Sequence, residues 1–145
     1  AEYTKLTEEA LKWIDTSCLW LINGGEEEEN RYAEAASGQL QGIFTGYGGS
    51  PETAQARLAP KGVAAFQSAT RLLEGQPEAV NIDAMVADIR VAAGESRPAF
   101  IEAWVLNWDW RINMLQEVQK RLGEDFVCVR PDVLVALFQA WKARQ

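Results

Sequence analysis

Apolar residues follow a helical period through most of the chain. Leu11, Ile14, Cys18 and Leu21 recur every three or four residues after Thr7, which suits a helix N-cap, and Asn23-Gly24-Gly25 ends the pattern. Similar stretches bounded by glycine, proline or capping residues follow at 26–44, 51–59, 63–73, 81–93, 96–123 and 131–144. The pattern predicts an all-α fold, a single-domain bundle of six to seven helices over residues 1–145.

Two features qualify this pattern. Phe126–Val129 is the only strand-like run, and it is short. Gly38 and Gly42 lie one turn apart in the stretch 26–44, where each weakens a helix by about 1 kcal/mol relative to alanine. Such glycines indicate close packing against another helix or a bend.

The stretch 96–123 is apolar on two sides when it is placed on a helix. One stripe contains Ile101, Trp104, Val105, Trp108, Ile112, Leu115 and Leu122, and the opposite side contains Leu106, Trp110 and Met114. A surface helix needs only one apolar stripe. We therefore expect a long, central, tryptophan-rich helix, covered on both sides by other helices or offering its second side to a partner.

The candidate binding residues come from this helix and from one loop. Trp110, Leu106 and Met114 are the candidate contacts for a protein partner or for a second copy in a homodimer, together with Tyr47 in a glycine-rich loop. Trp104 and Trp108, with Trp110, are the candidate lining of a pocket for a small apolar ligand. The favoured hypothesis is a non-enzymatic protein-binding domain, and the apolar-ligand pocket is the alternative.

Charge and composition exclude several classes of function. The net charge is −7, with nine acids and three bases in residues 1–50, and no basic patch typical of binding to nucleic acid or an anionic membrane surface. The absence of histidine removes the usual general base and zinc ligand, and no cofactor motif is present, so we predict no catalytic triad, metal or cofactor. We interpret the acidic run Glu26–Glu29 as a solvated helix start.

Catalysis by carboxylates is the one enzyme class that the composition does not exclude. A glycosidase needs two acids facing each other, one of them in an apolar pocket. Asp109 lies between two tryptophans, and Glu102 shares its side of the predicted helix. A carboxylate-dependent hydrolase is therefore a weaker third hypothesis.

The cysteines leave the compartment open. Cys18 and Cys128 are either two thiols of a cytoplasmic protein or one long-range disulfide of an exported, periplasmic one. The chain begins at Ala1 without an initiator methionine, which fits a processed N-terminus or an expressed fragment. We leave both alternatives open.

Two short stretches resemble known families. One is Cys18 followed by Tyr32 and Gly38-x-x-x-Gly42-Ile-Phe-x-Gly46, and the other is Phe126-Val-Cys128-Val-Arg-Pro131 running into an amphipathic helix. The pattern resembles the periplasmic HdeA-like acid chaperones and is similar to the immunity proteins that neutralise type VI secreted amidases. The resemblance implies an exported all-α domain with a Cys18–Cys128 bridge that works by binding another protein.

Overall fold

The protein is a mixed α/β domain. A computed structural model describes residues 2–46, 49–70, 73, 75–94, 98–103 and 112–145. The helices are α1 (Glu2–Leu11), α2 (Glu26–Ala35), α3 (Glu78–Ala93), α4 (Ile112–Leu122) and α5 (Pro131–Lys142), with a 3-10 turn at Pro60–Gly62. The strands are β1 (Cys18–Leu21), β2 (Gly42–Thr45), β3 (Arg57–Leu58) and β4 (Ala64–Gln67).

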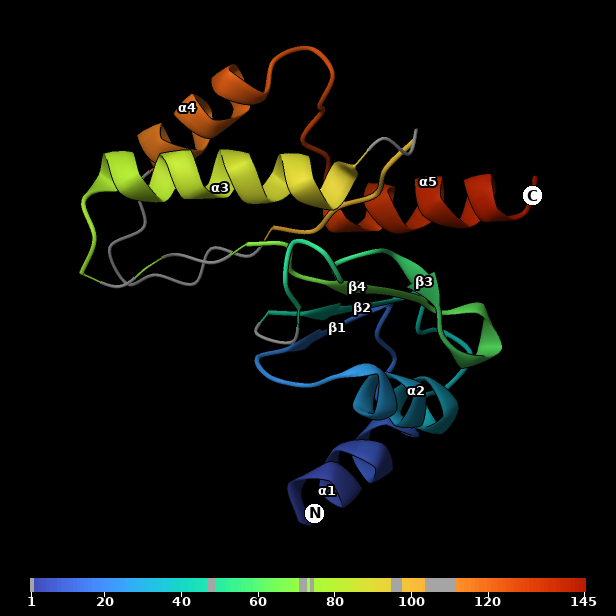
Figure 1. Ribbon diagram of the computed structural model, residues 1–145. Helices are drawn as coiled ribbons and strands as arrows, with labels where there is room; N and C mark the ends of the chain where they lie inside the picture. Colours follow the sequence, from blue (N-terminus) through green and yellow to red (C-terminus); the bar gives the residue numbers. More distant parts are fainter. Residues whose placement is uncertain (1, 47–48, 71–72, 74, 95–97, 104–111) are drawn as a thin grey trace.

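The four strands form one sheet in the order β1-β2-β4-β3. β1, β2 and β4 are parallel, and the short β3 pairs antiparallel with β4. Helix α2 makes the crossover from β1 to β2. Helices α3, α4 and α5 lie on one side of the sheet, while α1 and α2 lie on the other (Figure 1).

Alternating residues of the strands build two cores. Leu19, Leu21, Ile43 and Ala65 face α1 and α2, where they join Leu11, Tyr32, Ala33, Ala36, Leu40, Ala59 and Val63. Phe44, Ala64 and Phe66 face α5, where they pack against Val135 and Phe138. The ring centroids of Phe44 and Phe66 are 5.1 Å apart, and Phe100 packs edge-on against Phe138 at 5.4 Å. Both faces of the central strands β2 and β4 are therefore covered, whereas Trp20 of the edge strand β1 is 48% exposed.

Helices α3 and α4 form a separate packed pair. Ile82, Met85, Val86 and Ile89 of α3 contact Met114, Val118 and Leu122 of α4. Arg121 of α4 forms an ion pair with Asp83 of α3, and Arg90 of α3 donates to the carbonyl oxygen of Arg121 at 2.8 Å. Among the described residues, no helix is both long and apolar enough to cross a membrane.

The prediction of an all-α bundle is wrong. The run Cys18–Leu21 and the segments around 42–45 and 64–67 are strands rather than helices. These strands are short and apolar, β2 and β4 are buried on both faces, and a periodicity argument does not separate such a run from a buried helix. Gly42 lies in a strand and allows that strand to pass close to Val135 of α5. It does not mark a contact between two helices.

The predicted long tryptophan helix is also wrong over its first part. Residues 98–103 are not helical, with an isolated parallel bridge between Ser68 and Glu102, and the helix described in this region is α4, Ile112–Leu122. Residues 104–111 lie outside the described residues. The predicted helices at 81–93 and 131–144 are confirmed in α3 and α5.

A buried carboxylate ties α2 to three strands. Glu29 of α2 is 0% exposed, so its interpretation as part of a solvated helix start is wrong. Its Oε1 accepts hydrogen bonds from the Thr45 hydroxyl at 2.8 Å and the Gln67 amide at 3.2 Å, and its Oε2 pairs with the Arg57 guanidinium at 2.6 Å. Arg57 also donates to the Asn30 side chain at 2.8 Å. The charge is therefore neutralised and both oxygens are bonded, as burial requires.

We predict that Gly42→Ala destabilises the fold. An added Cβ would lie 2.5 Å from the Cγ2 methyl of Val135, a stiff β-branched side chain on α5. Overpacking of this kind costs about 1–3 kcal/mol in the free energy of unfolding, which urea titration measures. Gly38→Ala is the matched control, because no atom lies within 4 Å of its added Cβ. Equal effects of the two substitutions would refute the close contact.

We predict that Arg57→Met destabilises the protein by about 2–4 kcal/mol, because it leaves the Glu29 carboxylate buried without its counter-ion. The control is Arg31→Met, which breaks a more exposed pair with Glu8 and should cost no more than about 1 kcal/mol. Thermal and urea unfolding of both variants compare the two costs. A neutral Arg57→Met would mean that Glu29 does not depend on this ion pair.

Candidate functional site at the carboxyl end of the sheet

The three parallel strands end together. Leu21, Thr45 and Gln67 are in register at the last positions of β1, β2 and β4. In open parallel sheets, ligands bind outside these carboxyl ends. The loop after β2 lies close against β4 here, because a Cβ on Gly49 would be 2.9 Å from the carbonyl oxygen of Ser68. Side chains near this end that have unsatisfied polar atoms are therefore candidates for a site.

Glu102 is a buried carboxyl group without a full set of partners. The isolated bridge places it beside Ser68, directly after β4, and its carbonyl oxygen accepts a 2.9 Å hydrogen bond from the Ala69 backbone N–H. The residue is 7% exposed, and its Oε2 has no hydrogen-bond partner within the described residues. Burial raises the pKa of Glu102 to about 8, so the side chain is a neutral acid at pH 7.

A second carboxyl group approaches the same stretch of chain. Asp88 of α3 is half-buried, and its Oδ2 accepts a 2.8 Å hydrogen bond from the Thr70 hydroxyl. The Ser68 hydroxyl in turn donates to the Thr70 carbonyl oxygen at 2.7 Å. The backbone of Glu102 and the side chain of Asp88 are therefore both hydrogen-bonded to residues 68–70. This arrangement supplies a protonated acid and a second carboxyl group beside one short turn.

The structure describes few of the binding residues expected from the sequence. Met114 is 4% exposed and packs between α3 and α4, so its side chain is covered by the fold. The other candidates lie outside the described residues, and their roles stay predictions. They are Tyr47, Trp104, Leu106, Trp108 and Trp110, together with Asp109 of the hydrolase hypothesis.

Neither the cysteines nor a metal-binding cluster contributes to this site among the described residues. Cys18 and Cys128 are free thiols; Cys18 packs near α5, and Cys128 donates to the Gln119 side chain. Among the described residues, no group of three or more cysteine, aspartate and glutamate side chains could hold a metal ion.

Sequence reasoning found Glu102 but placed it wrongly. The acid was expected beside Asp109 on one helix, whereas the structure places it on a non-helical segment next to β4. Asp88 was missed, since only the tertiary contact between α3 and Thr70 brings it to the same turn. The local signal for Glu102 was that it is the single charged residue in the otherwise apolar run Phe100–Val105.

We predict that Glu102 makes the protein more stable at acidic than at mildly alkaline pH. The folded protein retains this proton up to about pH 8, whereas an unfolded glutamate loses it near pH 4.5. The free energy of unfolding should therefore fall as the pH rises through this window, by a few kcal/mol in total. Glu102→Gln should remove this slope in urea titrations at several pH values. Glu124→Gln, an exposed control, should keep it; a slope unchanged in Glu102→Gln would contradict the assignment.

The comparisons with known proteins correct the resemblance drawn from the sequence. No curated protein and no solved structure matches the chain. The HdeA-like chaperones and the amidase immunity proteins have no support, and the resemblance to them is wrong. Residues 1–139 match one family, described as "GxGYxYP putative glycoside hydrolase C-terminal domain". The sequence itself lacks that heptapeptide, and its nearest stretch is Gly46-Tyr-Gly-Gly-Ser-Pro51. Since the match spans nearly the whole chain, the chain belongs to the family of GxGYxYP putative glycoside hydrolase C-terminal domains.

Proposed function

We propose that this domain takes part in the hydrolysis of glycosidic bonds, with Glu102 as the general acid. The observation that carries the proposal is the buried, neutral Glu102 carboxyl group, whose Oε2 has no partner within the described residues, at the carboxyl end of a parallel sheet. The family description supports the same reaction class. It partly conflicts with the non-enzymatic protein-binding domain expected from the sequence, which stays an untested prediction.

The two carboxyl groups have different roles in this proposal. Glycoside hydrolysis needs one protonated acid for the leaving-group oxygen and one carboxylate that acts as nucleophile or as base for a water molecule. Glu102 retains its proton at neutral pH because its surroundings are desolvated, and it donates that proton as the bond to the leaving group breaks. Asp88, held by the Thr70 hydroxyl, is the second carboxylate. The identity of the sugar does not follow from these residues.

The test compares leaving groups on a panel of aryl and alkyl glycosides. We predict that Glu102→Gln lowers kcat/KM by about 10²–10⁴-fold on alkyl glycosides, which need a proton on the departing oxygen. The loss should be far smaller on dinitrophenyl glycosides, whose leaving group departs without a proton. Asp88→Asn should lose activity on both classes, and Glu124→Gln on neither.

The pH dependence of the activity is a second test of Glu102 as the general acid. Wild-type activity on alkyl glycosides should fall as the pH rises through about 8, because Glu102 then loses its proton. A chain inactive on every glycoside, or a Glu102→Gln variant with full activity on alkyl glycosides, would overturn the proposal.

A further inference from the structure

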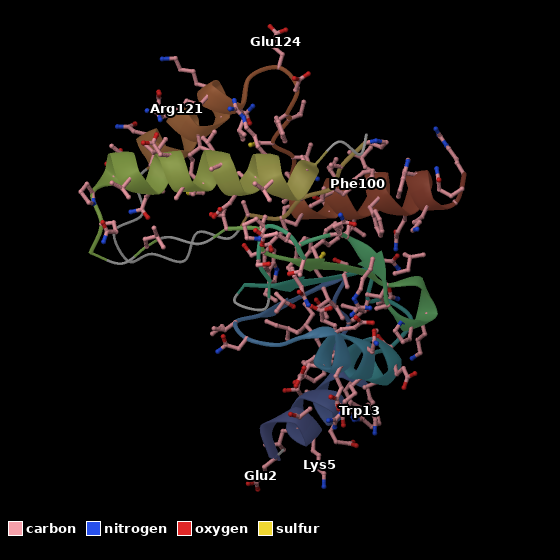
Figure 2. All side chains as sticks on the ribbon, viewed as in Figure 1. Glu2, Lys5, Trp13, Phe100, Arg121 and Glu124 are labelled. Atoms are coloured by element: carbon pink, nitrogen blue, oxygen red, sulfur yellow. The ribbon has the colours of Figure 1, made fainter. Side chains whose placement is uncertain are left out.

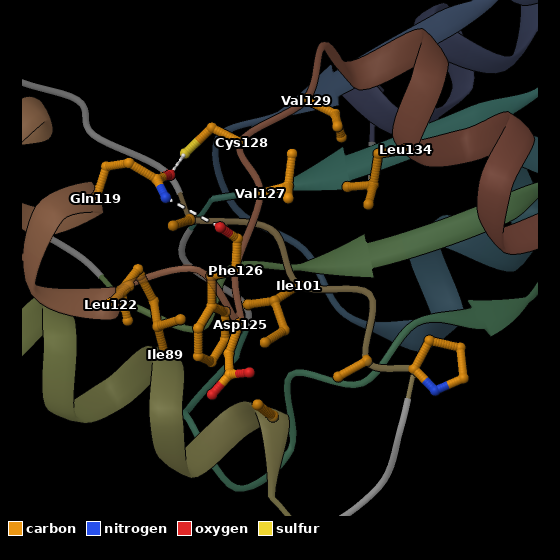
Figure 3. A pocket seen from close by; sticks show the side chains of 14 residues that line it. Ile89, Ile101, Gln119, Leu122, Asp125, Phe126, Val127, Cys128, Val129 and Leu134 are labelled. Atoms are coloured by element: carbon orange, nitrogen blue, oxygen red, sulfur yellow. Dashed lines mark hydrogen bonds between the residues drawn. The ribbon is translucent and has the colours of Figure 1, made fainter.

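A cavity of about 640 Å³ lies between α3, α4, the start of α5 and the segments 98–103 and 125–129 (Figure 3). Sites for small molecules in proteins usually have volumes of about 300–1,000 Å³. Val127 in the wall of the cavity is 79% exposed, so the cavity is open to solvent beside it. A small molecule can therefore reach the cavity without unfolding of the domain.

The wall of this cavity is mostly apolar. All but three of the side chains that line it are apolar, among them Ile89 of α3, Leu122 of α4 and Leu134 of α5. A sugar ring carries hydroxyl groups on most of its carbons, and an apolar wall leaves such groups without hydrogen-bond partners. The cavity therefore differs in chemistry from the proposed site at Glu102, whose own side chain does not line it.

The three polar side chains in the wall are Gln119, Asp125 and Cys128. The first and last are bonded within the protein, as the dashed lines of Figure 3 show. The Gln119 amide donates to the carbonyl oxygen of Phe126 at 3.0 Å, and its Oε1 accepts from the Cys128 thiol at 2.6 Å. The Asp125 carboxylate is exposed and forms neither a hydrogen bond nor an ion pair in the described part of the chain. The wall thus offers a ligand one negative charge beside apolar surface.

We propose that this cavity binds a small molecule with an apolar body and one protonated amine, which pairs with Asp125. The apolar body fills the cavity, because its transfer from water to an apolar wall is favourable. The ammonium group stays beside the exposed carboxylate, so neither charge has to lose all of its water. The net charge of −7 adds a weak, long-range attraction for cations. The proposal does not depend on the hydrolase function.

Three ligands of one shape and different charge test the proposal by calorimetric titration of the whole chain. Naphthylethylamine should bind saturably at one site. Naphthylethanol should bind about fivefold more weakly, because it lacks the ion pair at the exposed Asp125. Naphthylacetate should bind more weakly still, since its carboxylate meets a like charge. The preference for the amine should shrink at high salt.

Two pairs of variants locate the binding. Asp125→Asn should remove the preference for the amine and leave the affinity for naphthylethanol unchanged. Glu124→Gln makes the same change in charge one residue away, where the side chain points away from the body of the molecule (Figure 2), and should keep the preference. Ala99→Trp should weaken all three ligands by about tenfold or more, because Ala99 lines the cavity. Ala136→Trp on α5 is its control, since both alanines are exposed and only Ala99 lines the cavity.

Each of four results contradicts the proposal. They are the absence of saturable binding for all three ligands, equal affinities for the amine and the alcohol, a preference for the amine that Asp125→Asn keeps or that Glu124→Gln loses equally, and an unchanged affinity in Ala99→Trp. Urea unfolding of every variant confirms that a loss of binding does not come from a loss of the fold.

Discussion

The carboxylate of Glu29 is the constraint on which the arrangement of the sheet and its crossover helix depends. It accepts hydrogen bonds from the final residues of two parallel strands, and it forms an ion pair with Arg57 of the antiparallel strand beside them. A buried charge tolerates few geometries, because each unmet hydrogen bond leaves it desolvated without compensation. The interaction therefore fixes the depth of α2 under the sheet and aligns the strand ends, and these ends in turn position residues 68–70.

The same end of the sheet holds two buried glutamates with different partners. Glu29 has a guanidinium and two neutral donors around it, whereas the Oε2 of Glu102 has no hydrogen-bond partner within the described residues. Both side chains are almost fully buried, but only Glu29 is held by an ion pair among the residues described. Glu29 consequently has a structural role, and Glu102 is the candidate catalytic group.

The sequence predicted helices well where they are long, as in α3 and α5, and failed where apolar runs are short. Cys18-Leu-Trp-Leu has no polar alternation even though Trp20 is half exposed, so its period does not identify a strand. For the site, Glu102 could be singled out as an acid among apolar residues. Its place beside Ser68, the approach of Asp88 and the burial of Glu29 all come from contacts distant in sequence, which local patterns do not encode.

The close contact between Gly42 and Val135 has a consequence for the order in which the domain folds. It joins positions that lie far apart in the chain, and α5 is synthesised after β2 and β4. Until α5 emerges, Phe44 and Phe66 are exposed on the open face of a nascent sheet. Such surfaces attract chaperones and other unfolded chains. Loop closure over this distance also slows the search for the native contact. Truncation within α5 would therefore leave an aggregation-prone intermediate rather than a smaller stable domain.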